Sequence, residues 1–198
     1  MFPFQEGFEQ GARLADPLVS VGAIYLSDEA AEAFNTPTLG YLGAGTLIDR
    51  GADVIFAAAG LSGFGVIEAA YDYAQTNDGD VWSIGVDFDE QARMESWKSE
   101  PWAQGLPIEG WQDHILTSVV KRVDQAVVQV IDDYFTTGEV GPVELTVANG
   151  GIDFVPSDGL REIEHELETI RSALADGSIQ IVLDGDVDIE MLRDAVAP

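Results

Sequence analysis

The sequence predicts an α/β fold, a three-layer structure in which a parallel sheet carries helices on both faces. Apolar segments with the character of strands alternate along the chain with segments of helical period, and this alternation is typical of right-handed βαβ units. The two clearest strands, 53–58 and 81–86, are continuous and mostly apolar, as strands covered on both faces are. The first runs into a glycine-rich turn and the second into a pair of carboxylates, at the sheet edge where open α/β sheets bind ligands.

The first half of the chain supplies most of this alternation. Its helices are expected to end at residues that stop helices: Asp16-Pro17 after the first helix and Gly51 after the second. On the first helix, Phe4 and Phe8 share one face. The expected elements are, in order, helix 3–15, strand 18–26, loop 27–37, helix 38–50, strand 53–58, helix 63–74 and strand 81–86.

Residues 91–114 interrupt the pattern, because no period holds across them. They contain Trp97, Trp102 and Trp111 together with prolines and glycines. We expect a long loop, which is either a lid or partner-facing surface, or an Ω-loop packed on its own tryptophans. The elements expected after it are strand 115–116, helix 119–135 with Thr117-Ser118 as its N-cap, strand 142–148, strand 152–155, helix 160–175, strand 179–183 and an acidic tail, 184–198, with a short helix at 189–195.

The charge of the chain is strongly one-sided: 36 acidic residues against 9 basic ones give a formal net charge of −27. This excess argues against nucleic acid or anionic lipid as the main partner. The chain has no cysteine, so it has neither a disulfide frame nor a thiolate metal site. No apolar run approaches the roughly 20 residues that span a bilayer, and the start, MFPFQEGFEQ, lacks the basic and apolar regions of a secretory signal.

The glycine-rich turn contains Gly60, Gly63 and Gly65. Its spacing is neither that of a dinucleotide-binding turn nor that of a P-loop, and it holds no lysine, so we expect no triphosphate site. Its backbone N–H groups could instead meet a ligand hydroxyl or base edge; the alternative is a tight strand-to-helix turn without a ligand. Ser62 lies in G-x-S-G, and the two histidines have no evident partner, so no catalytic residue is expected.

Two carboxylates, Asp87 and Asp89, follow the strand 81–86. If the strand continues, its alternation places both side chains on one side. A carboxylate at this edge can accept two hydrogen bonds from a vicinal diol such as that of ribose. The alternatives are a Mg²⁺ or Ca²⁺ site and a solvated loop end. We favour the diol and expect no metal, because no third and fourth oxygen ligands are close in sequence.

Lys121 is one of only two lysines in the chain. It is expected in the first turn of helix 119–135, where a cation is electrostatically unfavourable. A ligand hydroxyl or Asp87 would explain this position; the alternative is an exposed lysine beside Arg122. Phe4 lies on the apolar face of the first helix, where core packing is the default and stacking on a planar base is the alternative.

Several segments together resemble the basic membrane lipoprotein family, whose members are purine-nucleoside-binding proteins of ABC importers with a type I periplasmic-binding fold. The resemblance extends over about residues 4–182. It rests on these blocks, in chain order: PFQEGFEQGA, AFNTPTLG, GADVIFAAAG, SGFGVIEAA, IGVDFDE, ILTSVVKRVDQAV, GGIDFVP and DGSIQIV.

This resemblance implies one lobe of a type I periplasmic-binding fold, which binds a nucleoside or related ribose-containing solute without catalysis or a cofactor. It implies that Asp87 and Lys121 bind the ribose hydroxyls, that Gly60 approaches the ligand through its backbone and that Phe4 stacks on the base. The implied partners are the nucleoside-like ligand and an ABC permease. The implied location is the cell envelope, lipid-anchored or periplasmic, although the chain as given shows no export signal.

The chain departs from the family in ways that shape its expected organisation. The family's N-terminal lobe and lipid-attached cysteine are missing, and its D-x-D-Q motif ends here in Glu90. The apolar face of the crossover helix, which packs on that lobe in the family, is then expected to be exposed, or covered in a homodimer. We divide the chain into a main α/β lobe (1–116), this crossover helix (117–140), a return strand and last helix (141–183) and an acidic tail (184–198).

Three origins fit this organisation: a fragment of a longer gene, which we favour, a split or degenerate paralogue, or a stand-alone module that dimerises. The leading function is the substrate-binding component of an ABC importer, or a fragment of one. The alternative is a cytoplasmic sensor or interaction module that keeps the binding lobe. A hydrolase using a metal held by Asp87 and Asp89 ranks third, because the chain offers no histidine pair, cysteine or phosphate loop.

Overall fold

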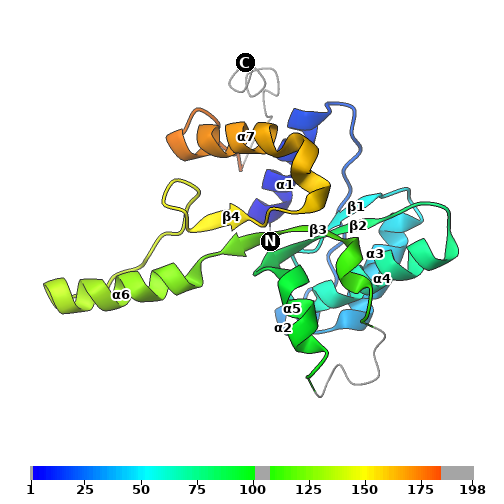
Figure 1. Ribbon diagram of the computed structural model, residues 1–198, viewed down its shortest axis with the longest axis horizontal. Coiled ribbons are helices and arrows are strands. Elements are labelled where there is room, and N and C mark those ends of the chain that lie inside the picture. The colour runs from blue at the N-terminus through cyan, green and yellow to red at the C-terminus, as the bar shows by residue number, and fades with distance from the viewer. Residues whose placement is uncertain (1, 101–107, 184–198) are drawn as a thin grey trace.

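The computed structural model, which describes residues 2–100 and 108–183, contains a four-stranded sheet with helices on both faces (Figure 1). The strands lie side by side in chain order: β1 (Val54–Phe56), β2 (Trp82–Asp87), β3 (Ile115–Lys121) and β4 (Ile152–Phe154). β1, β2 and β3 are parallel, whereas β4 pairs antiparallel with β3. The predicted α/β class is therefore confirmed, with one antiparallel edge strand added to the expected parallel sheet.

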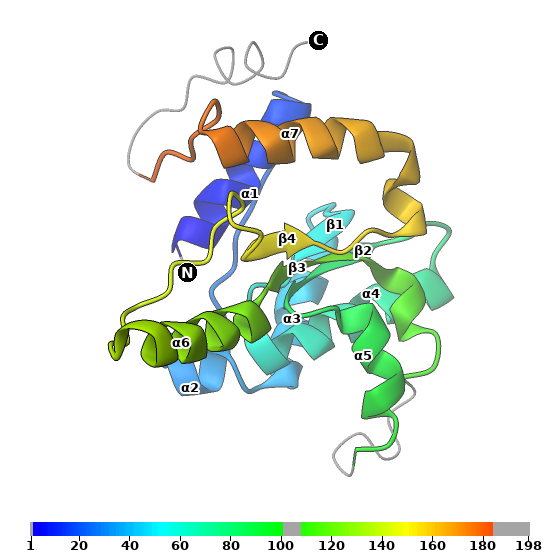
Figure 2. The same cartoon turned by 60° about the vertical axis from the view of Figure 1, so that its left-hand side comes forward.

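The helices form a layer on each side of this sheet. Their bounds are α1 Phe2–Ala15, α2 Ala30–Ala33, α3 Pro37–Ile48, α4 Gly63–Thr76, α5 Glu90–Trp97, α6 Val123–Thr137 and α7 Glu164–Asp176. α3, α4 and α5 cover one face, and α1 and α7 lie on the other (Figures 1 and 2). Gly138 and Gly177 end α6 and α7 in the left-handed conformation.

α4 is the central helix of the core, since it contributes to both large clusters of buried apolar side chains. One cluster joins Ile67 of α4 to Trp97 and Trp111. The other joins Ala70 of α4 to Ile55 of β1. The sheet edge that carries the site is therefore supported by the most buried helix described.

α3 packs on α4 with almost no space between their backbones. A Cβ atom on Gly65 would lie 2.5 Å from the nitrogen of Tyr41 and 2.8 Å from the carbonyl carbon of Pro37. A Cβ atom on Gly40 would lie 2.9 Å from the carbonyl carbon of Ser62. This close approach requires glycine at both positions. It explains Gly65, one member of the glycine-rich turn, by packing alone.

The long loop expected at 91–114 begins instead as a helix, α5, so this part of the prediction is wrong. Asp89 is its N-cap, and the carboxylate accepts a hydrogen bond of 2.9 Å from the N–H of Ala92. Met94 and Trp97 are buried, whereas most of the other side chains of α5 are exposed. Because so few positions of α5 are buried, its apolar residues form no clear helical repeat, and the helix could not be recognised from the sequence pattern.

The tryptophans of this stretch bear on the two alternatives for the loop. Trp97 and Trp111 are buried in one core cluster, which agrees with the packed alternative rather than with a lid. Two sequence predictions lie outside the described residues: the role of Trp102, which falls at 101–107, and the acidic tail 184–198 with its short helix.

β3 runs on to Lys121, well beyond the predicted strand 115–116. Thr117-Ser118 is therefore not an N-cap, and α6 begins only at Val123. The β-branched residues of ILTSVVK suit a strand, and this strand has neighbours on both sides, β2 and β4. The correction moves Lys121 from a helix N-terminus to the carboxyl end of a strand.

Three predicted strands, 18–26, 142–148 and 179–183, are irregular segments in the structure. None of them joins the described sheet, and an apolar alternating segment without a neighbour has no ladder to complete. The last segment is held instead by the Gln10 side chain. Its amide donates to the carbonyl of Val182 at 2.6 Å, and its oxygen accepts from the Val182 N–H at 3.0 Å.

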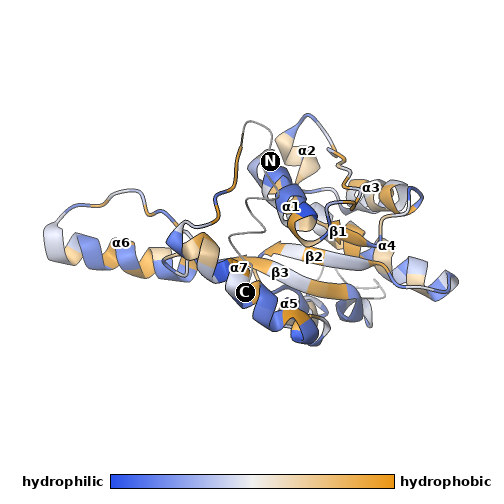
Figure 3. Ribbon diagram, turned by 90° about the horizontal axis from the view of Figure 1, so that it is seen from above, coloured by the Kyte–Doolittle hydropathy of each residue, from blue (hydrophilic) through white to orange (hydrophobic). Residues whose placement is uncertain are grey.

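α6 extends away from the sheet, and none of its residues is buried (Figure 3). The expected exposure of its apolar face is confirmed, with Phe135 81% exposed. The other exposed apolar side chains of α6 are Val123, Val127, Val128, Ile131 and Tyr134. Among the helices described here, none is both long enough and apolar enough to cross a membrane.

Candidate functional site

The carboxyl ends of β2 and β3 bring Asp87 and Lys121 together. Asp87 is the last residue of β2 and lies in register with Val120, next to Lys121 at the end of β3. The Lys121 Nζ atom lies 2.6 Å from Asp87 Oδ1. The two side chains are 34% and 45% exposed, so a solute can reach the pair. The contact considered from the sequence is present, although Lys121 arrives on a strand.

Phe4, on α1, lies beside this pair. The Lys121 Nζ atom is 4.9 Å from the centroid of the Phe4 ring, which is a cation–π distance. Phe4 is half-buried, and its ring centroid lies 6.4 Å from that of Phe56 in β1. Three of the four residues expected to bind ligand, Phe4, Asp87 and Lys121, therefore form one group, which we call the edge cluster.

Gly60, the fourth expected ligand residue, lies at the same edge but has other neighbours. It follows β1, which is parallel to β2, and its φ of +55° is in the region that favours glycine. A Cβ atom at this position would lie 3.1 Å from the Phe34 carbonyl oxygen. The nearest neighbours of Gly60 are therefore atoms of Phe34, which follows α2, and not residues of the edge cluster.

The backbone of Asp87 is strained. Its φ of +76° is the one positive value among the non-glycine residues that the structure describes. Such conformations cost free energy, and they persist where the surroundings impose them, often at functional sites. Sequence patterns carry no signal for this feature, because aspartate also occurs freely in ordinary loops.

Asp89 does not converge on the edge cluster with Asp87. The strand ends at Asp87, so the alternation that would have aligned the two carboxylates stops there. Asp89 instead caps α5. Across residues 2–100 and 108–183, no group of three histidine, cysteine or acidic side chains is arranged as metal ligands would be, so the metal alternative lacks a donor set.

Ser62 of the glycine-rich turn has a structural role. It is fully buried, and its hydroxyl oxygen accepts a hydrogen bond of 2.8 Å from the N–H of Thr36. This contact ties the turn to the start of α3, which leaves Ser62 poorly placed as a nucleophile.

Glu90 is a candidate that the sequence reasoning did not select as a ligand-site residue. It is 4% exposed, and its Oε2 atom is buried without a hydrogen-bond partner. Burial raises the pKa of Glu90 to about 7; a hydrogen bond from the Val86 backbone opposes this shift, and the negative charge of Asp87 adds to it. One sequence feature did mark this position: the family that the sequence resembles has glutamine here in its D-x-D-Q motif, whereas this chain has Glu90.

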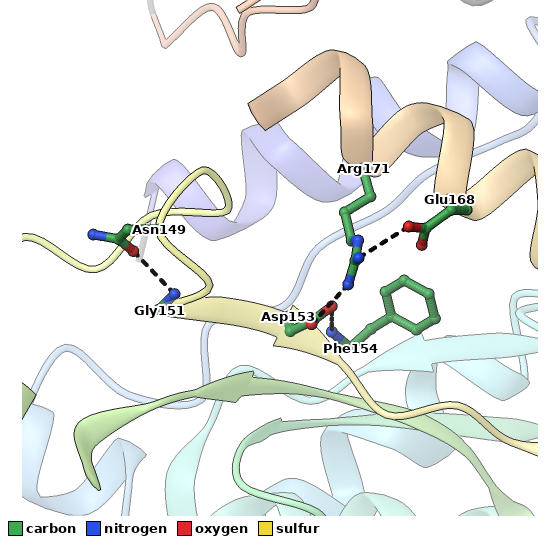
Figure 4. Close-up of polar contacts among 6 residues, drawn as sticks. All are labelled: Asn149, Gly151, Asp153, Phe154, Glu168 and Arg171. Atoms are coloured by element: carbon green, nitrogen blue, oxygen red, sulfur yellow. Dashed lines mark hydrogen bonds and ion pairs between the residues drawn. The ribbon is translucent and has the colours of Figure 1, made fainter. Parts of the chain in front are cut away.

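A separate groove lies between α7 and β4. Its volume is about 550 Å³, and the edge-cluster residues are not among its lining. The guanidinium group of Arg171, on α7, donates hydrogen bonds to the carboxylates of Asp153 at 3.0 Å and Glu168 at 2.9 Å (Figure 4). Because its guanidinium group is already paired and partly exposed, the groove offers a weaker case for a specific anion site than the edge cluster does for a solute site.

The fold and its polar edge are those of a class of α/β domains whose members commonly bind small molecules at the carboxyl ends of their parallel strands. Residues 1–180 match the family described as ABC transporter substrate-binding protein PnrA-like, or Bmp. The chain belongs to this family of substrate-binding proteins, and the resemblance stated from the sequence is confirmed.

Individual relatives agree with this membership. The chain is 28% identical over 188 residues to basic membrane protein D of Borreliella burgdorferi, covering 91% of this chain and 48% of the relative. It is 30% identical over 193 residues to the CD4+ T-cell-stimulating antigen of Listeria innocua, covering 94% of this chain and 48% of that protein. The chain thus spans about half the length of these curated relatives.

A solved structure supports the fold. An ABC transporter solute-binding protein from Aeropyrum pernix K1 superposes with a TM-score of 0.66 and 20% sequence identity. The match covers 98% of this chain and 58% of that one. At this identity the comparison bears on the fold alone, and it shows that nearly all of this chain has a counterpart in a larger solute-binding protein.

Proposed function

We propose that this chain is a substrate-binding component of an ABC importer, or part of one, and that it binds a nucleoside or related ribose-containing solute at the edge cluster. The observation that carries the proposal is the accessible Asp87–Lys121 pair, 2.6 Å apart, at the carboxyl ends of adjacent parallel strands. Chemistry other than binding is not needed to explain these residues, so we propose no enzymatic activity.

The edge cluster has the groups that a nucleoside requires. The Asp87 carboxylate accepts hydrogen bonds from two neighbouring hydroxyls, and the Lys121 ammonium group donates to one of them. Both groups neutralise each other in the free protein, so neither charge is left unpaired before the ligand arrives. The Phe4 ring offers a flat apolar surface to the base, and Gly60 offers a backbone N–H at the same edge.

The same proposal accounts for α6. In the proposed substrate-binding component, segment 117–140 crosses from this lobe to a second one, and the apolar face of α6 packs against that second lobe. Burying a valine, isoleucine or phenylalanine side chain contributes roughly 1.5–3 kcal/mol, so the face that includes Phe135 favours burial strongly. We further propose an ABC permease as partner and the cell envelope as location, in line with relatives named as basic membrane proteins.

The exposed face of α6 also favours a second candidate, an interaction module or sensor that dimerises through this helix. The two candidates differ in solution behaviour. A stable homodimer that Val127→Asp dissociates would support the module, because the substitution places a charge on the apolar face. A monomer at all concentrations would support the transport role.

The proposed ligand chemistry is tested by comparing adenosine with 2′,3′-dideoxyadenosine, which lacks the diol. Titration calorimetry at high ligand concentration is expected to show that adenosine binds more tightly. In Asp87→Asn the new asparagine tolerates the left-handed backbone. The substitution should lower the affinity for adenosine by about 10- to 100-fold, because hydrogen bonds to charged groups contribute roughly 1.5–3 kcal/mol. The affinity for 2′,3′-dideoxyadenosine should remain almost unchanged in this variant.

Asp89→Asn is the matched control, since asparagine keeps the N-cap of α5. It removes one charge from the same loop and should leave adenosine binding intact. Equal binding of the two nucleosides, or equal loss of affinity in both variants, would contradict a diol held by Asp87.

A further inference from the structure

The side chain of Glu90 folds back under the end of β2. A Cβ atom built on Gly85 would lie 2.6 Å from the carboxyl carbon of Glu90 and 2.7 Å from the hydroxyl oxygen of Ser118. Only glycine at position 85 leaves room for this arrangement. The carboxyl group therefore occupies a fitted space between β2 and β3.

Glu90 also closes the turn that presents Asp87. Its backbone N–H donates a hydrogen bond of 3.2 Å to the Ser118 hydroxyl oxygen, and its carboxyl group accepts one from the backbone of Val86. Asp87, with its φ of +76°, lies between these two anchoring points. The contacts that flank the strained residue thus converge on one buried residue, Glu90, through its backbone N–H and its carboxyl group.

We propose that Glu90 is a positioning residue for the edge cluster, which holds Asp87 in the left-handed conformation that aims its carboxylate at Lys121. The inference rests on the proposed function in so far as Asp87 binds the ligand. It adds a residue that does not touch the solute and acts through the backbone of the turn.

The charge state of Glu90 couples this role to pH. The charged group beside it is Asp87, at the end of β2; β3 presents Ser118 and α4 presents Gly63, and neither of these residues titrates. Near pH 7 the buried carboxyl group loses its proton, and a second negative charge then lies next to Asp87. That repulsion favours opening of the turn, so adenosine should bind more weakly above neutral pH.

The test uses the ligand-free protein first. NMR measures the backbone coupling and Cα chemical shift of Asp87 between about pH 5 and 9, a range that brackets the pKa of Glu90. In the wild type these signals should change with a midpoint near pH 7. Glu90→Gln keeps the shape without the charge and should hold the low-pH signals throughout, whereas Glu90→Ala should show the opened turn at every pH.

Adenosine affinity over the same range supplies the second readout. It should fall on the order of tenfold in the wild type and stay constant in Glu90→Gln. If the NMR signals of Asp87 change neither with pH nor in Glu90→Ala, the inference is overturned, even if adenosine binds. If the Asp87 signals change with pH and with the Glu90 substitutions but no nucleoside binds, the positioning role is supported. Only the proposed ligand is then contradicted.

Discussion

Gly65→Ala is expected to destabilise the protein by about 3 kcal/mol, because overpacking at a fixed contact costs up to roughly this amount. The new methyl group would lie 2.5 Å from the Tyr41 nitrogen and 2.8 Å from the Pro37 carbonyl carbon. These are backbone atoms of α3, which cannot turn aside as a flexible side chain can. The helices must separate, and the core around Ala70 opens with them.

Gly45→Ala is the matched control on the same pair of helices. Gly45 lies within α3, and a Cβ atom there would have nothing within 4 Å. Alanine favours a helix over glycine by about 1 kcal/mol, so this variant should be slightly more stable than the wild type. Urea unfolding of the three proteins measures the difference; similar midpoints for both variants would mean that α3 and α4 are not in close contact.

Glu90→Gln is expected to change the pH dependence of stability. The folded pKa of Glu90, about 7, lies above its ordinary value of 4.5. The stability that its protonated form contributes is complete below pH 4.5, falls as the pH rises towards 7 and is lost above it. The shift corresponds to a loss of up to about 3 kcal/mol, which glutamine would avoid.

The difference in unfolding free energy between Glu90→Gln and the wild type isolates this contribution from the other acidic residues. It should be small near pH 4.5 and reach up to about 3 kcal/mol in favour of the variant at pH 8. Glu164→Gln, at an exposed position of α7, removes one charge without burial and should show no such rise. A constant difference for Glu90→Gln across pH would show that its carboxyl group is not buried.

The strands and helices around α4 were predictable because their patterns are strong and local. The segment 81–86 is mostly apolar, and helix 63–74 carries Val66, Ile67, Ala70 and Tyr71 at helical spacing. Both elements are present, within a residue or two of the expected bounds. The first half of α4 and the end of β2 are largely buried, so local preference and tertiary packing agree.

The region around Lys121 was not predictable in the same way. The residues TSVVKRV suit a capped helix as well as a strand, and the position of the strand between β2 and β4 decides between the two. The opposite error occurred at 18–26 and 142–148, where strand-like patterns meet no partner within the described sheet. In each case tertiary neighbours, which the sequence pattern does not contain, set the outcome.

The edge cluster was predicted residue by residue but not as an arrangement. Asp87 was chosen because it follows a predicted strand, and Lys121 because the chain has only two lysines. The structure joins them in one ion pair. The burial of the Glu90 carboxyl group depends on the space left by Gly85. Such space is a property of the packed sheet, so no pattern in the sequence could reveal it.

Chemical-shift mapping of the backbone amides during an adenosine titration tests the central claim most directly, because it locates the ligand without assuming a site. We predict that the largest changes cluster at Gly60, Asp87 and Lys121, and that Asp87→Asn removes them. Changes confined to the groove beside Arg171, or none at saturating adenosine, would contradict a nucleoside site at the carboxyl ends of β2 and β3.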